Sequence, residues 1–364
     1  MILDIVRSFF KKLIVSNTKI HTPMKRESNI ELLRIVAMLL LMGVHANYVA
    51  LGAPDASDII ENPTNAFFRI LTENICIVGV NVFVMISGWF GIRYKAKGLC
   101  NLLFQCLFFS IAVYIIYFIT GRVEFNRINI MSSFLLYKNA YWFVWAYLIL
   151  YAIAPMLNTF IENSDQKTFK RALIIFWTIE MVVYLFTFCG FFDSGYNPLH
   201  FIGLYLLARY FNLYVKNYDK WTCLATYALC VICNTLMCFL PAMLLGHENN
   251  TLSSISVTYT GPLNIIGALS LLLFFTKLEI KSKLINWISI SCLTVYIIHS
   301  HECIYLQYRA AALYIYNNYS GVIFFAVMIA FILSVFIACI LVDKIRIYLF
   351  NKLWNLFVSR SSGN

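Results

Sequence analysis

Long apolar stretches separated by short polar segments constrain this chain more than any other feature of its sequence. Hydrophobic residues make up 61% of the 364 positions and charged residues only 12%. Soluble domains are about half apolar and about a quarter charged. A helix of about 20 apolar residues is long enough to cross a bilayer. The chain is therefore expected to be an all-α, polytopic integral membrane protein.

About ten such stretches are predicted, with short loops between them. They cover residues 31–52, 70–91, 99–120, 132–156, 172–192, 198–214, 222–245, 255–276, 284–306 and 321–342. The sixth is short, so it could also be tilted or re-entrant. We expect three regions: a basic amphipathic segment at 1–30 on the inner membrane surface, a transmembrane domain at 31–342 and a basic cytoplasmic tail at 343–364.

The basic residues are divided unevenly between the two sides of this arrangement. Of the 28 Lys and Arg residues, 22 fall in segments on the side of the N-terminus and five on the opposite side, with Arg34 inside the first stretch. Cytoplasmic segments carry the excess of Lys and Arg in membrane proteins, so both termini are expected to be cytoplasmic. Because the cations are interspersed, the net charge of +11 does not indicate a nucleic-acid partner.

The eleven cysteines lie mostly within apolar stretches. Cys230 and Cys233 have CxxC spacing, but they fall inside a predicted span, where packing is expected rather than redox or metal chemistry. No metal site is expected elsewhere in the chain.

Two ionisable residues of the first stretch, Arg34 and His45, are the strongest functional candidates. Eleven steps of about 100° bring His45 within roughly 20° of Arg34 on one helix face, about 16 Å further along. Ionisable residues inside a membrane are costly and indicate a functional site. Each also has a structural explanation, since Arg34 could snorkel to headgroups and His45 could bond a neighbouring helix. Together they suggest a path for an anionic ligand that leads to a general base.

The second stretch carries small residues and ends in a basic cluster. Gly79, Ser87 and Gly88 would let a helix or a slender ligand approach closely. Three cations follow: Arg93, Lys95 and Lys97. They suit the phosphates of a cytosolic ligand, although the orientation bias also predicts them.

Five further residues are candidates for the acceptor side or for structure: Glu73, Asn81, Trp142, Glu180 and His299. Glu180 lies well inside a span and must have a partner, which the sequence does not identify. Trp142 fits an interfacial aromatic belt better than a sugar-stacking platform. His299 could contact a sugar or mark the water interface.

Four segments, in order, resemble the membrane-bound acyltransferase 3 family. They are the Arg34–His45 pair, GVNVFVMISGWFGI, YWFVWAYLILYAIAPMLN and ISISCLTVYIIHSH, which contains His299. The resemblance covers nearly the whole chain. It implies a ten-helix membrane enzyme that moves an acyl group, usually acetyl from cytosolic acetyl-CoA, to a sugar of a cell-surface glycan or its precursor. It also implies that Arg34 and His45 are essential.

The resemblance is less close after the second stretch. The family has a basic pair with R-x-x-R spacing there, whereas this chain has Arg93, Lys95 and Lys97. Which of these cations contacts the donor therefore stays open. The family's SGNH extension is absent, so any relay of the acyl group to such a domain would need a separate protein.

The expected function is that of a multi-pass O-acetyltransferase in a bacterial plasma membrane, with 31–342 as its acyltransferase domain. Its partners would be acetyl-CoA or another acyl-CoA, a cell-surface glycan or lipid-linked precursor, and membrane lipids. His45 would deprotonate the acceptor hydroxyl, and direct acyl transfer to His45 is a variant left open. The alternative is a flippase, exporter or polymerase of lipid-linked glycans. It is less favoured because intramembrane charges are few and no repeated halves are visible.

Overall fold

The computed structural model describes residues 26–135, 141–186, 193–247 and 250–362, and within these ranges the only regular secondary structure is helical. The surface segment expected at 1–30 falls almost wholly outside them. The first helices are α2 (Ser28–Ala46), α3 (Tyr48–Leu51), α4 (Ala56–Glu61), α5 (Pro63–Cys76), α6 (Gly79–Phe90), α7 (Ala96–Ile119), α8 (Arg127–Ser133) and α9 (Trp142–Asn163). The later ones are α10 (Gln166–Phe186), η2 (Asp193–Gly195), α11 (Pro198–Tyr214), α12 (Lys220–Leu245), α13 (Asn250–Ser256), α14 (Pro262–Thr276), α15 (Lys283–Ser289), α16 (Cys292–His299), α17 (Glu302–Asn318) and α18 (Gly321–Ser362).

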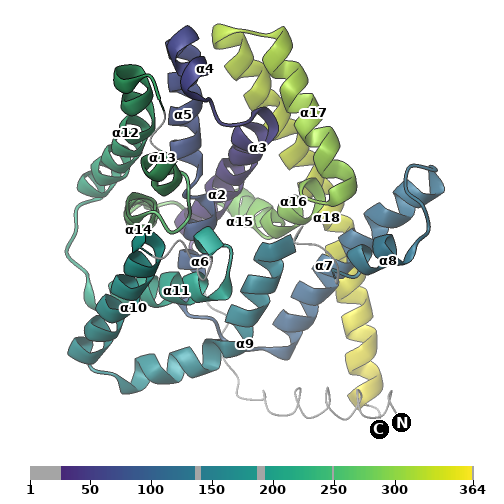
Figure 1. Ribbon diagram of the computed structural model, residues 1–364. Helices are drawn as coiled ribbons and strands as arrows, with labels where there is room; N and C mark the ends of the chain where they lie inside the picture. The colour runs from purple at the N-terminus through teal and green to yellow at the C-terminus, as the bar shows by residue number, and fades with distance from the viewer. Residues whose placement is uncertain (1–25, 136–140, 187–192, 248–249, 363–364) are drawn as a thin grey trace.

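Helix α6 lies at the centre of the bundle and packs against α2, α11 and α14 (Figure 1). Its sequence, GVNVFVMISGWF, is apolar on nearly every side, which is typical of a helix surrounded by other helices. Two glycines allow the closest approaches. A Cβ on Gly79 would lie 2.8 Å from the carbonyl oxygen of Ala37 in α2, and a Cβ on Gly88 would lie 2.8 Å from Cα of Tyr205 in α11.

Six helical segments are long and apolar enough to cross a membrane: Ser28–Leu51, Pro63–Phe90, Ala96–Ile119, Trp142–Asn163, Lys220–Leu245 and Gly321–Leu356. The bent pair α15–α16 and α17 makes a seventh if it counts as one span. By this measure the expected number of about ten is not confirmed. The remaining predicted ranges hold α10, α11 and α14. The 15 residues of α14 extend only about 22 Å, less than a hydrocarbon core of about 30 Å.

Two predicted ranges differ from the helices that the structure contains. The ninth, 284–306, is not one helix, because the chain turns by 89° between α16 and α17. The tenth, 321–342, continues without a break as α18 as far as Ser362, so residues 343–362 of the segment expected as a tail belong to the same helix. Buried contacts of Asp343 and Arg346 with the bundle account for this continuation, as described below.

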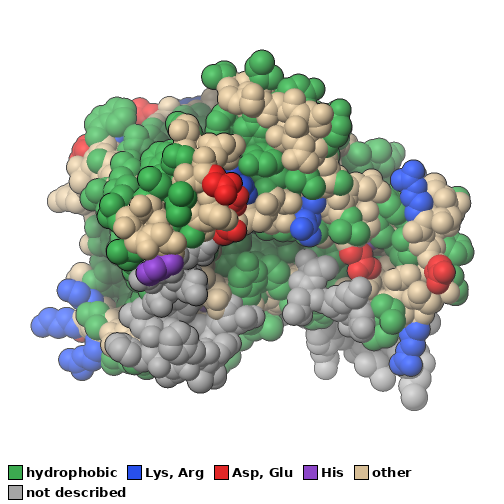
Figure 2. All heavy atoms as spheres, turned by 45° about the horizontal axis from the view of Figure 1, so that its top comes forward, with side chains coloured by type: hydrophobic (Ala, Val, Ile, Leu, Met, Phe, Trp, Pro, Cys, Tyr) green, Lys and Arg blue, Asp and Glu red, His purple; other side chains and the backbone are tan. Residues whose placement is uncertain are grey.

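The surface is largely apolar. On the face shown in Figure 2, hydrophobic and uncharged side chains dominate, and charged ones occur in separate small groups. Along α18, Val322, Ile323 and Ile337 are all more than half exposed. Such a face suits contact with lipid chains rather than with water.

Candidate active site

Arg34 and His45 lie on one face of α2, with Met38 and Leu41 between them. The side chain of Arg34 is 30% exposed and donates to Glu31 Oε2 over 2.7 Å, one turn earlier in the helix. His45 is half-buried in the last turn of α2, beside the break at Asn47 that separates α2 from α3. The expected stripe is therefore present, with a paired cation at one end and an imidazole at the other.

The imidazole of His45 contacts a second histidine that comes from α16. His45 Nδ1 lies 2.9 Å from Nε2 of His299, and the two ring centroids are 5.0 Å apart. His299 is fully buried, and its Nδ1 lies 2.6 Å from the carbonyl oxygen of Val295. The ring of Tyr305 meets His45 edge-on, with centroids 5.3 Å apart. The sequence analysis named His299 as a candidate but did not connect it with His45, which is 254 positions away.

A small apolar cavity adjoins the stripe between its two ends. Its volume is about 20 Å³, enough for about one water molecule. It is lined from α2, α6, α9 and α16 by Met38, Leu41, Val80, Phe83, Phe143, Leu293 and Tyr296. A ligand wider than a single unbranched chain could pass between Arg34 and His45 only if these side chains moved apart.

The basic segment after α6 is held by its backbone. The N–H of Ile92 donates to the Tyr205 hydroxyl over 3.0 Å, and Asn158 Nδ2 donates to the Ile92 carbonyl over 2.8 Å. Tyr205 in turn donates to Asn158 over 2.6 Å. The side chains of Arg93 and Lys95 are therefore exposed on a fixed loop.

Two other cations lie near this loop. Lys97 is exposed and lies over the ring of Trp354 in α18, 5.8 Å from its centroid. Arg209 of α11 donates to the Trp89 carbonyl over 3.1 Å and packs beside Gly91. In the sequence, Arg209 is one of the 22 basic residues expected on the side of the N-terminus. Its position inside a short apolar helix gave no sign of this contact.

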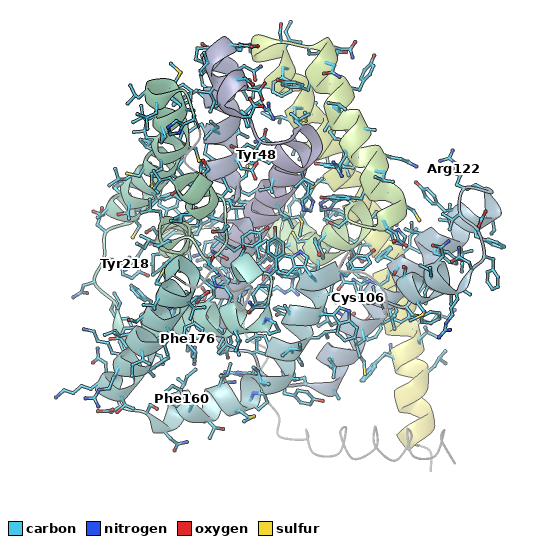
Figure 3. All side chains as sticks on the ribbon, in the orientation of Figure 1. Tyr48, Cys106, Arg122, Phe160, Phe176 and Tyr218 are labelled. Atoms are coloured by element: carbon cyan, nitrogen blue, oxygen red, sulfur yellow. The ribbon has the colours of Figure 1, made fainter. Side chains whose placement is uncertain are left out.

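The small residues of α6 are accounted for by helix packing. Gly79 and Gly88 sit against the backbones of α2 and α11, and Ser87 Oγ lies 3.1 Å from the Tyr147 hydroxyl of α9. Gly203 of α11 similarly makes room for the ring of Phe176 in α10 (Figure 3). Donor contacts by Gly79, Ser87 and Gly88 therefore remain a prediction.

Glu180 has a partner, which is His200. Glu180 Oε1 lies 2.6 Å from Nδ1 of His200, and Nε2 of the same ring lies 3.2 Å from Asn81 Oδ1. Asn81 Nδ2 then donates to the Tyr259 carbonyl over 2.9 Å. Glu180, His200 and Asn81 are all fully buried. This network joins α10, α11, α6 and the segment before α14.

Glu73 stabilises the break at the end of α2. Asn47 Nδ2 donates to Glu73 Oε2 over 3.0 Å and to the Arg69 carbonyl over 2.9 Å. The backbone N–H of Tyr48, which Figure 3 labels, approaches the same carboxylate oxygen at 3.4 Å. Glu73 thus contacts the side chain two residues beyond His45 and the backbone N–H three residues beyond it.

Trp142 belongs to an aromatic group. Its ring centroid lies 4.5 Å from that of Tyr196 and 5.8 Å from that of Tyr259, and those two tyrosines are 5.1 Å apart. The three rings contact one another, so packing explains Trp142 without a sugar.

A second buried ion pair, which the sequence analysis missed, ties α18 to the bundle. Arg346 donates to Asp343 through Nε and Nη2, over 2.8 and 3.0 Å, and to Asn101 of α7 over 2.8 Å. Asp343 also accepts from the Thr294 hydroxyl of α16 over 2.6 Å. Thr294 lies in the same short helix as His299, so this network fixes the helix that carries the second histidine.

Metal ligation has no candidate in the described part of the chain, where no three His, Cys, Asp or Glu side chains are grouped to hold an ion. The groups available for an anionic cofactor are the cations Arg34, Arg93, Lys95 and Lys97.

Comparison with known proteins identifies the family of the chain. A family model described as an acyltransferase domain, that of the acyltransferase 3 family, matches residues 27–344. The match spans α2 to just beyond the middle of α18 and includes Arg34, His45 and His299. No curated protein and no solved structure matches the chain. The chain belongs to the acyltransferase 3 family, and it is a multi-pass membrane protein with a transferase domain.

Proposed function

We propose that this protein transfers an acyl group, expected to be acetyl, from cytosolic acyl-CoA to a hydroxyl of a cell-envelope glycan or its lipid-linked precursor. The reaction takes place within the helix bundle of a bacterial plasma membrane, with both termini in the cytoplasm. Family membership supports acyl transfer. Donor, acceptor and catalytic base are our proposal.

The observation that carries the proposal is the stripe of α2. Nδ1 of His45 lies within hydrogen-bond distance of His299, whereas Nε2 of His45 has no hydrogen-bond partner among the described residues. Nε2 of His45 can therefore accept a proton. It lies at one end of the α2 face, and the cation of Arg34 lies at the other. General bases are most often histidines held in this manner.

The donor enters from the end that carries Arg34. The coenzyme A phosphates bind the exposed cations of the loop after α6, together with Arg34, while the thin pantetheine arm follows Met38 and Leu41 toward His45. The apolar lining suits an uncharged arm but not the phosphates. This division of charge keeps the anionic part of the donor near water.

The chemical step needs one base. His45 Nε2 accepts the proton of the acceptor hydroxyl as its oxygen attacks the thioester carbonyl carbon. The carbon–sulfur bond then breaks, and the departing thiolate takes the proton from the imidazolium. No oxidant, reductant or metal takes part, and the products are the acyl ester and free coenzyme A.

The test compares cells that produce wild-type protein, the His45→Ala variant or no copy. We expect an acyl mass increment on surface glycans only with wild type, because loss of a general base lowers the rate by about 10²–10⁴-fold. His301→Asn is the matched control. His301 is also buried, but it contacts the Ser110 carbonyl and the Cys303 N–H rather than His45. Full decoration with His45→Ala would refute the proposal, and unchanged decoration with reduced surface glycan would favour export.

A further inference from the structure

The second histidine has a proton whose position is fixed by its neighbours. His299 Nδ1 lies 2.6 Å from the Val295 carbonyl oxygen, in the preceding turn of α16. A carbonyl oxygen can only accept, so Nδ1 must carry the hydrogen. The ring of His299 is thereby anchored to its own helix.

The other nitrogen of His299 is an acceptor. His299 is 0% exposed, and no carboxylate lies within hydrogen-bond distance of it among the described residues. A charged imidazolium there would be an unpaired buried cation, which is costly, so the ring is neutral and Nε2 has a lone pair. The Ser300 hydroxyl lies 3.5 Å from Nε2, at the limit of a hydrogen bond, whereas His45 Nδ1 lies at 2.9 Å.

We propose that His299 is a positioning residue that holds His45 as the Nδ1–H tautomer, so that Nε2 of His45 faces the reacting groups as the free base. The chain of donors runs from His45 Nδ1–H to His299 Nε2 and from His299 Nδ1–H to the Val295 carbonyl. This inference rests on the proposed function, because it assigns a partner to the same base.

The arrangement has two chemical effects. It selects one tautomer, since the hydrogen bond made by one ring nitrogen decides which nitrogen carries the proton. It also supplies an acceptor for Nδ1–H when His45 becomes an imidazolium during proton transfer. Serine proteases use a buried carboxylate for this purpose, and an amide that favours the wrong tautomer costs about 10⁴-fold in rate there. Here a neutral imidazole takes that position, so no second charge is buried.

Three substitutions separate this role from packing. His299→Gln keeps a carbonyl oxygen near the former Nε2, within reach of His45 Nδ1. His299→Asn keeps an amide near the former Nδ1, able to bond Val295, but is too short to reach His45. His299→Leu removes both bonds. His301→Asn is the control, because it makes the same change two residues away without touching His45.

The kinetic readout uses purified protein, acetyl-CoA and the acceptor glycan identified by the mass comparison. We expect kcat to fall about 10²-fold or more in the Asn and Leu variants, with KM for acetyl-CoA unchanged. The Gln variant is expected to lie between these and wild type, and His301→Asn to match wild type. Equal loss in Gln, Asn and Leu variants, or wild-type kcat in the Leu variant, would overturn the inference.

A second readout needs no activity and no variant of His299. Nitrogen NMR of wild-type protein with ¹⁵N-labelled histidine rings distinguishes a protonated from an unprotonated ring nitrogen, and the signals missing from His45→Ala identify His45. We expect Nδ1 of His45 to carry the proton. A protonated Nε2 would overturn the inference. If His45→Ala retains full activity, the proposed function fails; if only the His299 results disagree, the function stands without this partner.

Discussion

At the scale of single residues, two pairs of ionisable side chains are buried in the interior. Glu180 Oε1 lies 2.6 Å from His200 Nδ1, and Arg346 donates to both carboxylate oxygens of Asp343. In the first pair the outer oxygen of Glu180, Oε2, has no partner among the described residues. Removing one member of a buried pair leaves the other uncompensated, which costs about 3–5 kcal/mol.

His200→Leu is therefore expected to destabilise the protein strongly, because Glu180 would remain buried without its partner. The double variant Glu180→Leu/His200→Leu is expected to lose less stability than His200→Leu alone, since no charge is left behind. Thermal unfolding in detergent measures both. Glu162→Gln changes an exposed carboxylate and serves as the control. A double variant less stable than His200→Leu would contradict this account.

At the scale of elements, the candidate residues lie where helices break. His45 precedes the break after α2, and His299 ends α16 just before the 89° turn into α17. Backbone that leaves the helix inside a membrane must find partners for its N–H and C=O groups. At the first break the Glu73 carboxylate lies 3.4 Å from the backbone N–H of Tyr48, and at the second the side chain of His301 caps α17. Close packing of unbroken helices holds these breaks in position.

The contact between α6 and α11 tests that packing. Gly88→Ala is expected to destabilise the protein by about 1–3 kcal/mol, because the added methyl group would overlap the backbone of Tyr205. Gly267→Ala in α14 is the matched control, since its methyl group would meet nothing closer than 3.5 Å. Unfolding temperatures of the two variants give the comparison. Equal unfolding temperatures would show that α11 can shift away from α6 at little cost in free energy.

At the scale of the whole molecule, the loops divide between two ends. Figure 1 shows α4 and the turn between α17 and α18 at one end, and the turn between α9 and α10 together with the last turns of α18 at the other. The first group was expected outside the cell and the second inside. The distribution of Lys and Arg predicts which end is cytoplasmic, and this assignment stays a prediction.

Reporter fusions test the orientation. We expect alkaline phosphatase to be active when fused after residues 54, 122 and 247, and a fluorescent protein to fold when fused after residues 95, 165 and 364. The physical reason is the excess of Lys and Arg on the second set of segments. Each site carries both reporters, so every position has its own control. One predicted span separates each neighbouring pair among sites 54, 95, 122 and 165, so the same reporter result at such a pair would identify a span that does not cross. Three predicted spans lie between 165 and 247 and three between 247 and 364, so the same result there would show that the number crossing is even.

The features that could be predicted from the sequence are those that depend on a local pattern of residues. The stripe from Arg34 to His45 follows from helix periodicity alone, and Glu180 was marked as needing a partner because of its cost. His200 could not be named as that partner, since its own helix gave no sign of contact with Glu180. The turn at Ser300 was missed because the stretch lacks Gly and Pro, although the four residues 299–302 are polar. Asp343 and Arg346 looked like a solvated tail, but spacing of three residues lets them pair and be buried.

The narrow cavity beside Met38 and Leu41 also has an electrical consequence. Proton conduction along a row of water molecules over the roughly 16 Å from Arg34 to His45 would need several of them in contact. The cavity of about 20 Å³ accommodates about one. The apolar side chains around this cavity therefore leave no room there for a continuous row of water molecules. Under the proposed function, the uncharged pantetheine arm would fill the gap when it opens, so this part of the α2 face would conduct no protons while the donor is bound.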